Sequence, residues 1–99
     1  MRVVFMGNPE FAIPTLKLLQ KSRHDLLAVV SNKPKPMGRG RILKSTPVGQ
    51  FAKENKIKLL EHDNLNAIDF QNQLKNLEAD IFLVVAYRIL PEKVIRIPK

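Results

Sequence analysis

The chain has 99 residues, no cysteine, and 17 basic against 9 acidic residues, which gives a formal net charge of +8. This length allows one domain at most, and the absence of cysteine excludes a disulfide framework and a thiolate metal site. No apolar run approaches the roughly 18 residues that a membrane span needs, and no secretory leader is recognised, so we expect a cytoplasmic protein without a membrane partner.

The N-terminal segment 2–6 is largely apolar without polar alternation, which predicts a strand buried on both faces. Gly7, Asn8 and Pro9 follow as a turn, in which Asn8 can cap the next helix and Pro9 can occupy its first position. In that helix, Pro14 either begins the regular part after an irregular first turn or introduces a kink. Ligand loops of α/β folds lie at such turns, although a simple capped turn is the more common explanation.

A second apolar strand is predicted over 26–31, and the segment 32–41 that follows contains two prolines and two glycines. This composition argues against both helix and strand, so we expect a long loop. Residues 26–53 contain six basic residues and no acidic one, and therefore carry +6 of the net charge. Clustered basic residues bind phosphates by releasing counterions, which predicts a polyanionic partner; a solvated loop without a partner is the alternative.

After the loop, helices and strands alternate again. The predicted elements are a helix opened by Thr46 and Pro47 that runs to about Asn55, a strand over 57–60, a helix over 66–77, a strand over 81–86 and a short helix over 91–95. The order β-α-β-loop-α-β-α-β predicts a mainly parallel sheet with right-handed crossovers. This is the first half of a doubly wound, Rossmann-like α/β fold.

The strand over 81–86 is the most apolar run of the chain, which predicts a position in the middle of the sheet. If the chain stops at Lys99, one edge of this strand lies open, and open edges promote aggregation. We therefore expect residues 1–99 to be an N-terminal piece of a longer protein, or to have this edge covered by a partner chain.

The polar residues do not form a convincing catalytic set. The serines lack a nucleophile-elbow context. His24 and His62 are isolated in turn-like segments, where we expect them to be exposed. Glu61, His62 and Asp63 are consecutive, so their side chains diverge and a metal site is improbable. No catalytic residue and no metal ligand is predicted.

Three motifs in register resemble one family, the methionyl-tRNA formyltransferases. Residues 4–14 (VFMGNPEFAIP) are similar to the opening of the family, with Asn8 in place of the usual threonine. Residues 33–41 (KPKPMGRGR) and 45–48 (STPV) resemble its basic loop and the segment after it. Residues 84–91 (VVAYRILP) resemble a further segment, one residue shorter than its glycine-containing version. The similarity covers essentially the whole chain in order.

The resemblance implies a reaction. Members of this family transfer a formyl group from 10-formyltetrahydrofolate to the α-amine of methionine on initiator methionyl-tRNA, without a metal. Their catalytic asparagine and histidine lie in an N-x-H-x-S-L-L-P segment, expected just after Lys99. Residues 1–99 are therefore expected to be the N-terminal part of the formyltransferase domain and inactive alone. The rest of that domain and a C-terminal tRNA-binding domain are expected to lie beyond them.

The resemblance also assigns two binding roles. The basic loop of the family enters the acceptor-stem region of tRNA, which implies tRNA contacts for Lys33, Lys35, Arg39, Arg41 and Lys44. In the wider superfamily, main-chain groups of an R-I-L segment hold the pterin of the folate, and the matching residues are Arg88, Ile89 and Leu90. The turn at Gly7, Asn8 and Pro9 is expected near both, because the carboxyl ends of parallel strands share one sheet edge.

Two other functions remain open from the sequence. A sugar-nucleotide or ribonucleotide formyltransferase would share the scaffold and the folate chemistry, but has no reason to carry the basic G-R-G loop. A small RNA-binding α/β module without catalysis would explain the +6 segment alone.

Overall fold

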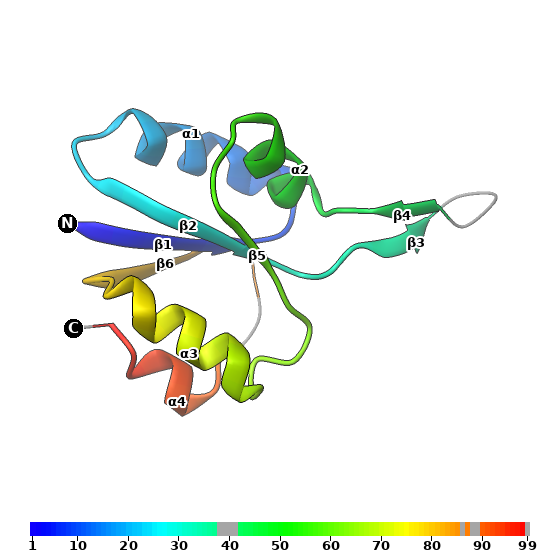
Figure 1. The fold of residues 1–99 in the computed structure, drawn as a ribbon. Coiled ribbons are helices and arrows are strands. Elements are labelled where there is room, and N and C mark those ends of the chain that lie inside the picture. Colours follow the sequence, from blue (N-terminus) through cyan, green and yellow to red (C-terminus); the bar gives the residue numbers. More distant parts are fainter. Residues whose placement is uncertain (38–41, 86, 88–89, 99) are drawn as a thin grey trace.

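The structure is a computed structural model that describes residues 1–37, 42–85, 87 and 90–98. It contains a four-stranded parallel sheet in the order β5-β2-β1-β6, with helices on both faces (Figure 1). Its strands are β1 (Arg2–Gly7), β2 (Asp25–Ser31), β5 (Leu59–Glu61) and β6 (Ile81–Val85). The parallel pairing and the two helical layers confirm the Rossmann-like α/β architecture.

Two apolar cores lie between the sheet and its helices. The helices are α1 (Ile13–Lys21), α2 (Pro47–Glu54), α3 (Ile68–Leu77) and α4 (Glu92–Ile95). In β1, Val3 and Phe5 face the core under α1 and α2, whereas Val4 and Met6 face the core under α3 and α4. This alternation follows the two-residue period of a strand, and it confirms that β1 is buried on both faces.

The two predicted helix starts have different outcomes. Thr46 caps α2 as expected, because its Oγ1 accepts a hydrogen bond from the Gly49 amide at 3.0 Å. The capping role predicted for Asn8 is wrong: Pro9 holds the cap position without a side-chain hydrogen bond, and a 3₁₀ turn over Glu10–Ala12 precedes α1. Pro14 lies in the first turn of α1, so the regular helix begins there after an irregular entry.

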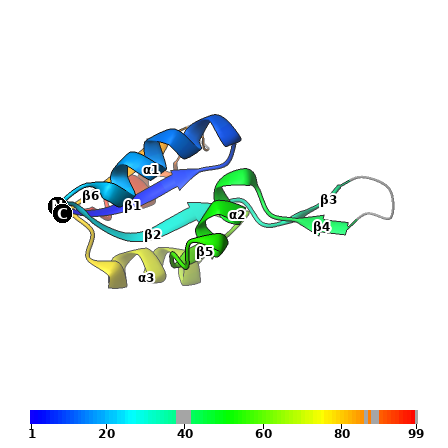
Figure 2. The same ribbon diagram turned by 90° about the horizontal axis from the view of Figure 1, so that it is seen from above.

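The basic segment contains strands, which corrects the expectation of a loop without them. β3 (Lys35–Met37) pairs antiparallel with β4 (Ile42–Lys44), and this hairpin projects away from the sheet (Figures 1 and 2). Proline is tolerated here because each strand of a two-stranded hairpin has a free edge toward which the missing N–H can point. Pairing across the hairpin outweighs the local propensity of the Pro-rich segment.

The strand over 81–86 was predicted in the middle of the sheet, with one edge open if the chain stops at Lys99, and the described residues do leave that edge open. Within the described residues, β6 pairs with β1 alone and forms the edge of the sheet opposite β5. Ile81 and Val84 are 42% and 41% exposed. Apolar composition reports burial of the two faces of a strand, whereas the number of neighbouring strands depends on topology. Residue 86 lies outside the described residues.

No helix among the described residues has the length and apolar character needed to cross a membrane.

Candidate functional site

The carboxyl ends of β1, β2 and β6 meet at one edge of the sheet, and the hairpin leaves the body from this edge (Figure 1). Gly7 ends β1 and pairs with Val85 of β6. A Cβ at Gly7 would lie 2.8 Å from the Val85 carbonyl oxygen and 3.0 Å from the Phe5 ring. Only glycine lets the ends of these two strands approach so closely.

A chain of hydrogen bonds joins this edge to the hairpin and to α2. Ser31, fully buried at the end of β2, donates to Asn8 Oδ1 at 2.9 Å, and the Asn32 amide donates to the same oxygen at 2.9 Å. The Asn8 oxygen only accepts, so the Ser31 hydroxyl accepts in turn from the Thr46 hydroxyl. The Gly49 amide donates to Thr46 Oγ1, so the donor and the acceptor of each hydrogen bond in this chain are defined.

Both strands of the hairpin are attached to residues at the end of β5. On the β4 side, Ser45 Oγ donates to Glu61 Oε2 at 2.9 Å and accepts from Lys53 Nζ at 2.6 Å. Lys53 Nζ also lies 3.7 Å from Glu61 Oε1. On the β3 side, the Lys33 amide donates to Asp63 Oδ1 at 3.1 Å. These contacts hold the root of the hairpin against the body.

Glu61 and Asp63 contact the root of the hairpin, whereas His62 between them contacts α3. His62 is half-buried, which corrects its expected exposure: its ring packs 4.7 Å from the Phe70 ring, and its Nε2 lies 3.0 Å from Gln73 Oε1. His24 is exposed as expected. The described residues contain no group of three or more histidine, aspartate or glutamate side chains able to hold a metal ion.

The structure brings part of the predicted tRNA-binding set together on the hairpin. Lys33 precedes β3 and Lys44 ends β4, and both side chains are exposed. Lys35 lies in β3 opposite Lys44 in the strand register. Arg39 and Arg41 lie outside the described residues. Contact of these residues with tRNA stays a prediction.

The predicted folate-binding set lies only partly within the described residues. Arg88 and Ile89 lie outside them. Leu90 is half-buried against the core under α3 and α4, and it lines a hollow of about 330 Å³ beside β6 together with Phe82 and Val84. The structure therefore places Leu90 at the free edge of the sheet, and its role in binding folate stays a prediction.

The turn at Gly7, Asn8 and Pro9 does lie at the carboxyl edge, but its central residue acts differently from the expectation. Asn8 connects β1 to the start of the hairpin instead of capping a helix. Sequence reasoning did not single out Ser31, Asn32 or Thr46 as parts of one site. The available signal was the pair of polar residues, Ser31 and Asn32, that ends an otherwise apolar strand. Asn32 Oδ1 is buried and has no hydrogen-bond partner among the described residues.

Comparison with known proteins gives a consistent assignment. The family profile described as formyl transferase matches residues 1–99. A methionyl-tRNA formyltransferase of Prochlorococcus marinus strain MIT 9312 is 43% identical over 101 aligned positions, which cover 100% of this chain and 31% of that protein. The relatives of the same name from Pelotomaculum thermopropionicum and Acetivibrio thermocellus are 45% and 41% identical, and the chain covers 32% of each. The chain therefore spans about a third of the length of the curated relatives that it matches.

Proposed function

The chain belongs to the formyl transferase family, and from this premise we propose that the protein transfers a formyl group from 10-formyltetrahydrofolate to the amino group of initiator methionyl-tRNA, in the cytoplasm. The observation that carries the choice of acceptor is the basic hairpin, which leaves the body at the carboxyl edge of the sheet. A small acceptor needs no projecting cationic arm, whereas an RNA stem presents rows of phosphates to it. The names of the relatives support the same choice.

In this proposal the hairpin binds the acceptor stem. Lys33 and Lys44 are exposed on it, and Lys35, Arg39 and Arg41 belong to the same segment. The charges of Lys33 and Lys44 lie in water in the structure, and RNA binding would release counterions from the phosphates. The hydrogen bonds at its root hold the arm at a defined angle to the edge where the turn at Gly7, Asn8 and Pro9 lies. The main chain of Arg88, Ile89 and Leu90 is proposed to hold the pterin.

Formyl transfer needs a neutral amine, a polarised formyl oxygen and a base that takes a proton. We propose that the groups that polarise and deprotonate follow residue 99, and that residues 1–99 position the two substrates. The turn at Gly7, Asn8 and Pro9 and the root of the hairpin lie at the carboxyl edge, which supports this division, because ligands of open parallel sheets bind outside the carboxyl ends of the strands. No step of this scheme requires a metal ion.

The test measures transfer of a radiolabelled formyl group from 10-formyltetrahydrofolate by the protein produced from its complete reading frame. Initiator methionyl-tRNA is compared with an amino-sugar nucleotide and an amino-ribonucleotide as acceptor. We expect label on the tRNA alone. Label on either nucleotide acceptor would reassign the substrate, and tRNA binding without transfer would reduce the protein to an RNA-binding module.

The role of the hairpin has its own readout. The logarithm of the tRNA binding constant is measured against the logarithm of salt concentration. The double substitution Arg39→Ala and Arg41→Ala should flatten the slope by up to about 2, because each phosphate contact contributes about 0.9 on a duplex. An unchanged slope would remove both arginines from the interface.

A further inference from the structure

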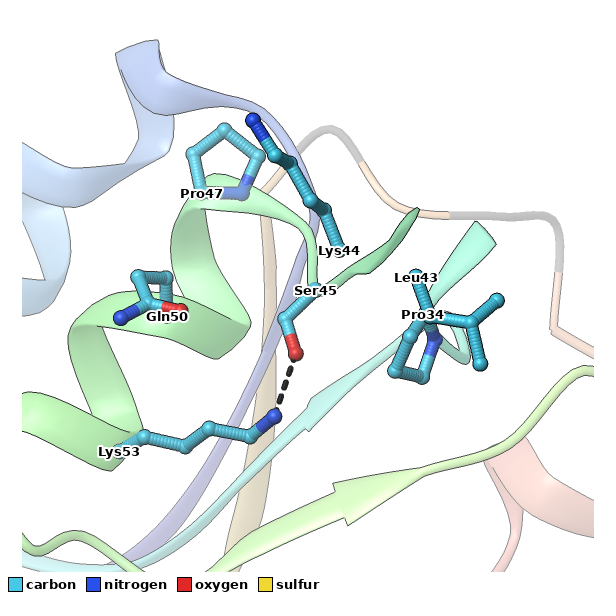
Figure 3. Close-up of a pocket in the computed structure, with 7 residues that line it drawn as sticks. All are labelled: Pro34, Leu43, Lys44, Ser45, Pro47, Gln50 and Lys53. Atoms are coloured by element: carbon cyan, nitrogen blue, oxygen red, sulfur yellow. Dashed lines mark hydrogen bonds between the residues drawn. The ribbon is translucent and has the colours of Figure 1, made fainter. Parts of the chain in front are cut away.

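An open groove of about 630 Å³ separates the root of the hairpin from α2 (Figure 3). Pro34, Leu43 and Lys44 form the wall on the side of the hairpin, and Pro47, Gln50 and Lys53 form the wall on the side of α2. Ser45 joins the two walls. The volume falls within the range of roughly 300–1,000 Å³ that is typical of ligand sites. The groove does not include the turn at Gly7, Asn8 and Pro9.

The two cations of the groove are arranged differently. The Lys53 side chain extends to Ser45, whereas the Lys44 side chain extends from β4 toward Pro47 (Figure 3). Lys53 donates one hydrogen bond to Ser45 and pairs with Glu61 at 3.7 Å, and N–H donors of its ammonium group remain for a ligand. Lys44 has no ion-pair partner among the described residues. One ammonium group is thus held in place by the protein, and the other is available in full.

The remaining surface of the groove combines apolar walls with one amide. Leu43 is 65% exposed, and the rings of Pro34 and Pro47 lie on opposite sides of the opening. Gln50 donates from Nε2 to Glu54 Oε1 at 3.0 Å, which leaves its Oε1 to accept a hydrogen bond. Apolar surfaces, ammonium groups and a glutamine amide can contact the base, the phosphate and the base edge of a nucleotide.

The positive charge around the groove favours a polyanionic ligand. Residues 26–53, which include both walls of the groove, contain six basic residues and no acidic one. Among the described residues, the acidic side chains of Glu54 and Glu61 contact groove residues, and Lys53 and Ser45 hold Glu61. A polyanion is therefore the complementary partner, and the basic hairpin already carries its neighbouring contacts.

We propose that this groove binds one nucleotide of the RNA strand that the hairpin contacts, with its phosphate at Lys44 and Lys53 and its base against Leu43 and the prolines. The assignment rests on the proposed function, because the RNA is the same tRNA. It adds a contact on the α2 side of the arm, where Lys44 of the predicted tRNA-binding set lines the groove. The groove thereby extends the interface from the arm onto the body of the domain.

The test compares substitutions that introduce a charge in the groove with substitutions that introduce the same charge at a distant surface position. Gln50→Glu and Gln50→Lys are compared with Gln20→Glu and Gln20→Lys, which change the net charge equally at an exposed position of α1. Binding of initiator tRNA is measured by fluorescence anisotropy with the protein from its complete reading frame. We expect Gln50→Glu to weaken binding about fivefold relative to Gln20→Glu, the size of the repulsion between two unit charges about 4 Å apart in water.

The two lysine substitutions distinguish a local charge effect from misfolding. Gln50→Lys should tighten binding relative to Gln20→Lys, an outcome that misfolding cannot produce. If the Gln50 and Gln20 substitutions changed tRNA affinity equally, while the unsubstituted protein still bound tRNA, the nucleotide site in the groove would be wrong and the proposed function would stand. Failure of the unsubstituted protein to bind tRNA would instead overturn the proposed function.

Photocrosslinking gives an independent readout. A tRNA that carries 4-thiouridine in its acceptor arm is irradiated in the complex, and crosslinked peptides are mapped. We expect crosslinks on the peptide that contains Leu43 and on the first turns of α2. Crosslinks confined to the hairpin without α2 would contradict the groove. Adenosine monophosphate that bound as tightly as the tRNA would contradict the assignment to an RNA strand.

Discussion

The sheet body and the projecting hairpin are stabilised by different forces. In the body, the side chains of β1 and β2 are buried between two helical layers, and burial of apolar surface dominates. The hairpin has two strands of three residues, and Leu43 and Lys44 on it are exposed. It is tied to the body by polar contacts at its root, through Ser45, Thr46 and Lys33.

This difference bears on where the basic residues of the chain are located. A basic cluster on a compact surface repels itself and lowers stability. On an arm that projects into solvent, water and salt screen the same charges. We therefore expect the body to determine the free energy of unfolding and the hairpin to determine RNA binding, with the root contacts coupling the two.

The largest expected effect belongs to the body. Phe70 is fully buried in the core under α3, and Phe70→Ala should lower the free energy of unfolding by about 3–5 kcal/mol through lost burial and the cavity left behind. Urea denaturation measures this change. Phe11→Ala is the matched control, since Phe11 is 72% exposed and its loss should change the free energy by about 0.5 kcal/mol or less. Equal effects at the two positions would contradict the described core.

The contact between body and hairpin gives an intermediate effect. Thr46→Val keeps the shape of the side chain but removes the cap of α2 and the donor to Ser31, which should lower the free energy of unfolding by about 1–2 kcal/mol. Thr46→Ser keeps the hydroxyl and should retain most of the stability. Hydrogen exchange of the β3 and β4 amides should accelerate in the valine variant only. If valine and serine behaved alike, the hydroxyl would not hold the root of the hairpin.

The smallest effect on stability belongs to the arm itself. Lys44→Gln should change the free energy of unfolding by about 0.5 kcal/mol or less, because the side chain is exposed. The same substitution should lower the slope of tRNA affinity against salt by about 0.9, the contribution of one phosphate contact. Lys21→Gln at the end of α1 removes an equal charge and should leave the slope unchanged. A loss of stability without a change of slope would show that Lys44 serves the fold and not RNA binding.

Local patterns in the sequence determined the elements but not their partners. The apolar runs predicted β1 and β2, and the Thr46-Pro47 pair predicted the start of α2. The cap assigned to Asn8 was wrong because the side chain bonds to Ser31 and Asn32, which lie 23 and 24 residues further along the chain. Such a partner cannot be recognised from neighbouring residues.

The sequence by itself determined the alternation of strands and helices, the burial of β1 and the concentration of charge in one segment. Each depends on spacings of a few residues, which the periods of strand and helix set. Only the tertiary structure decided that β1 lies between β2 and β6, that the Pro-rich segment pairs as a hairpin, and that Ser45, Lys53 and Glu61 meet at its root. These depend on which distant segments pack together, because strand order and side-chain partners follow from packing of the whole chain and not from local propensity.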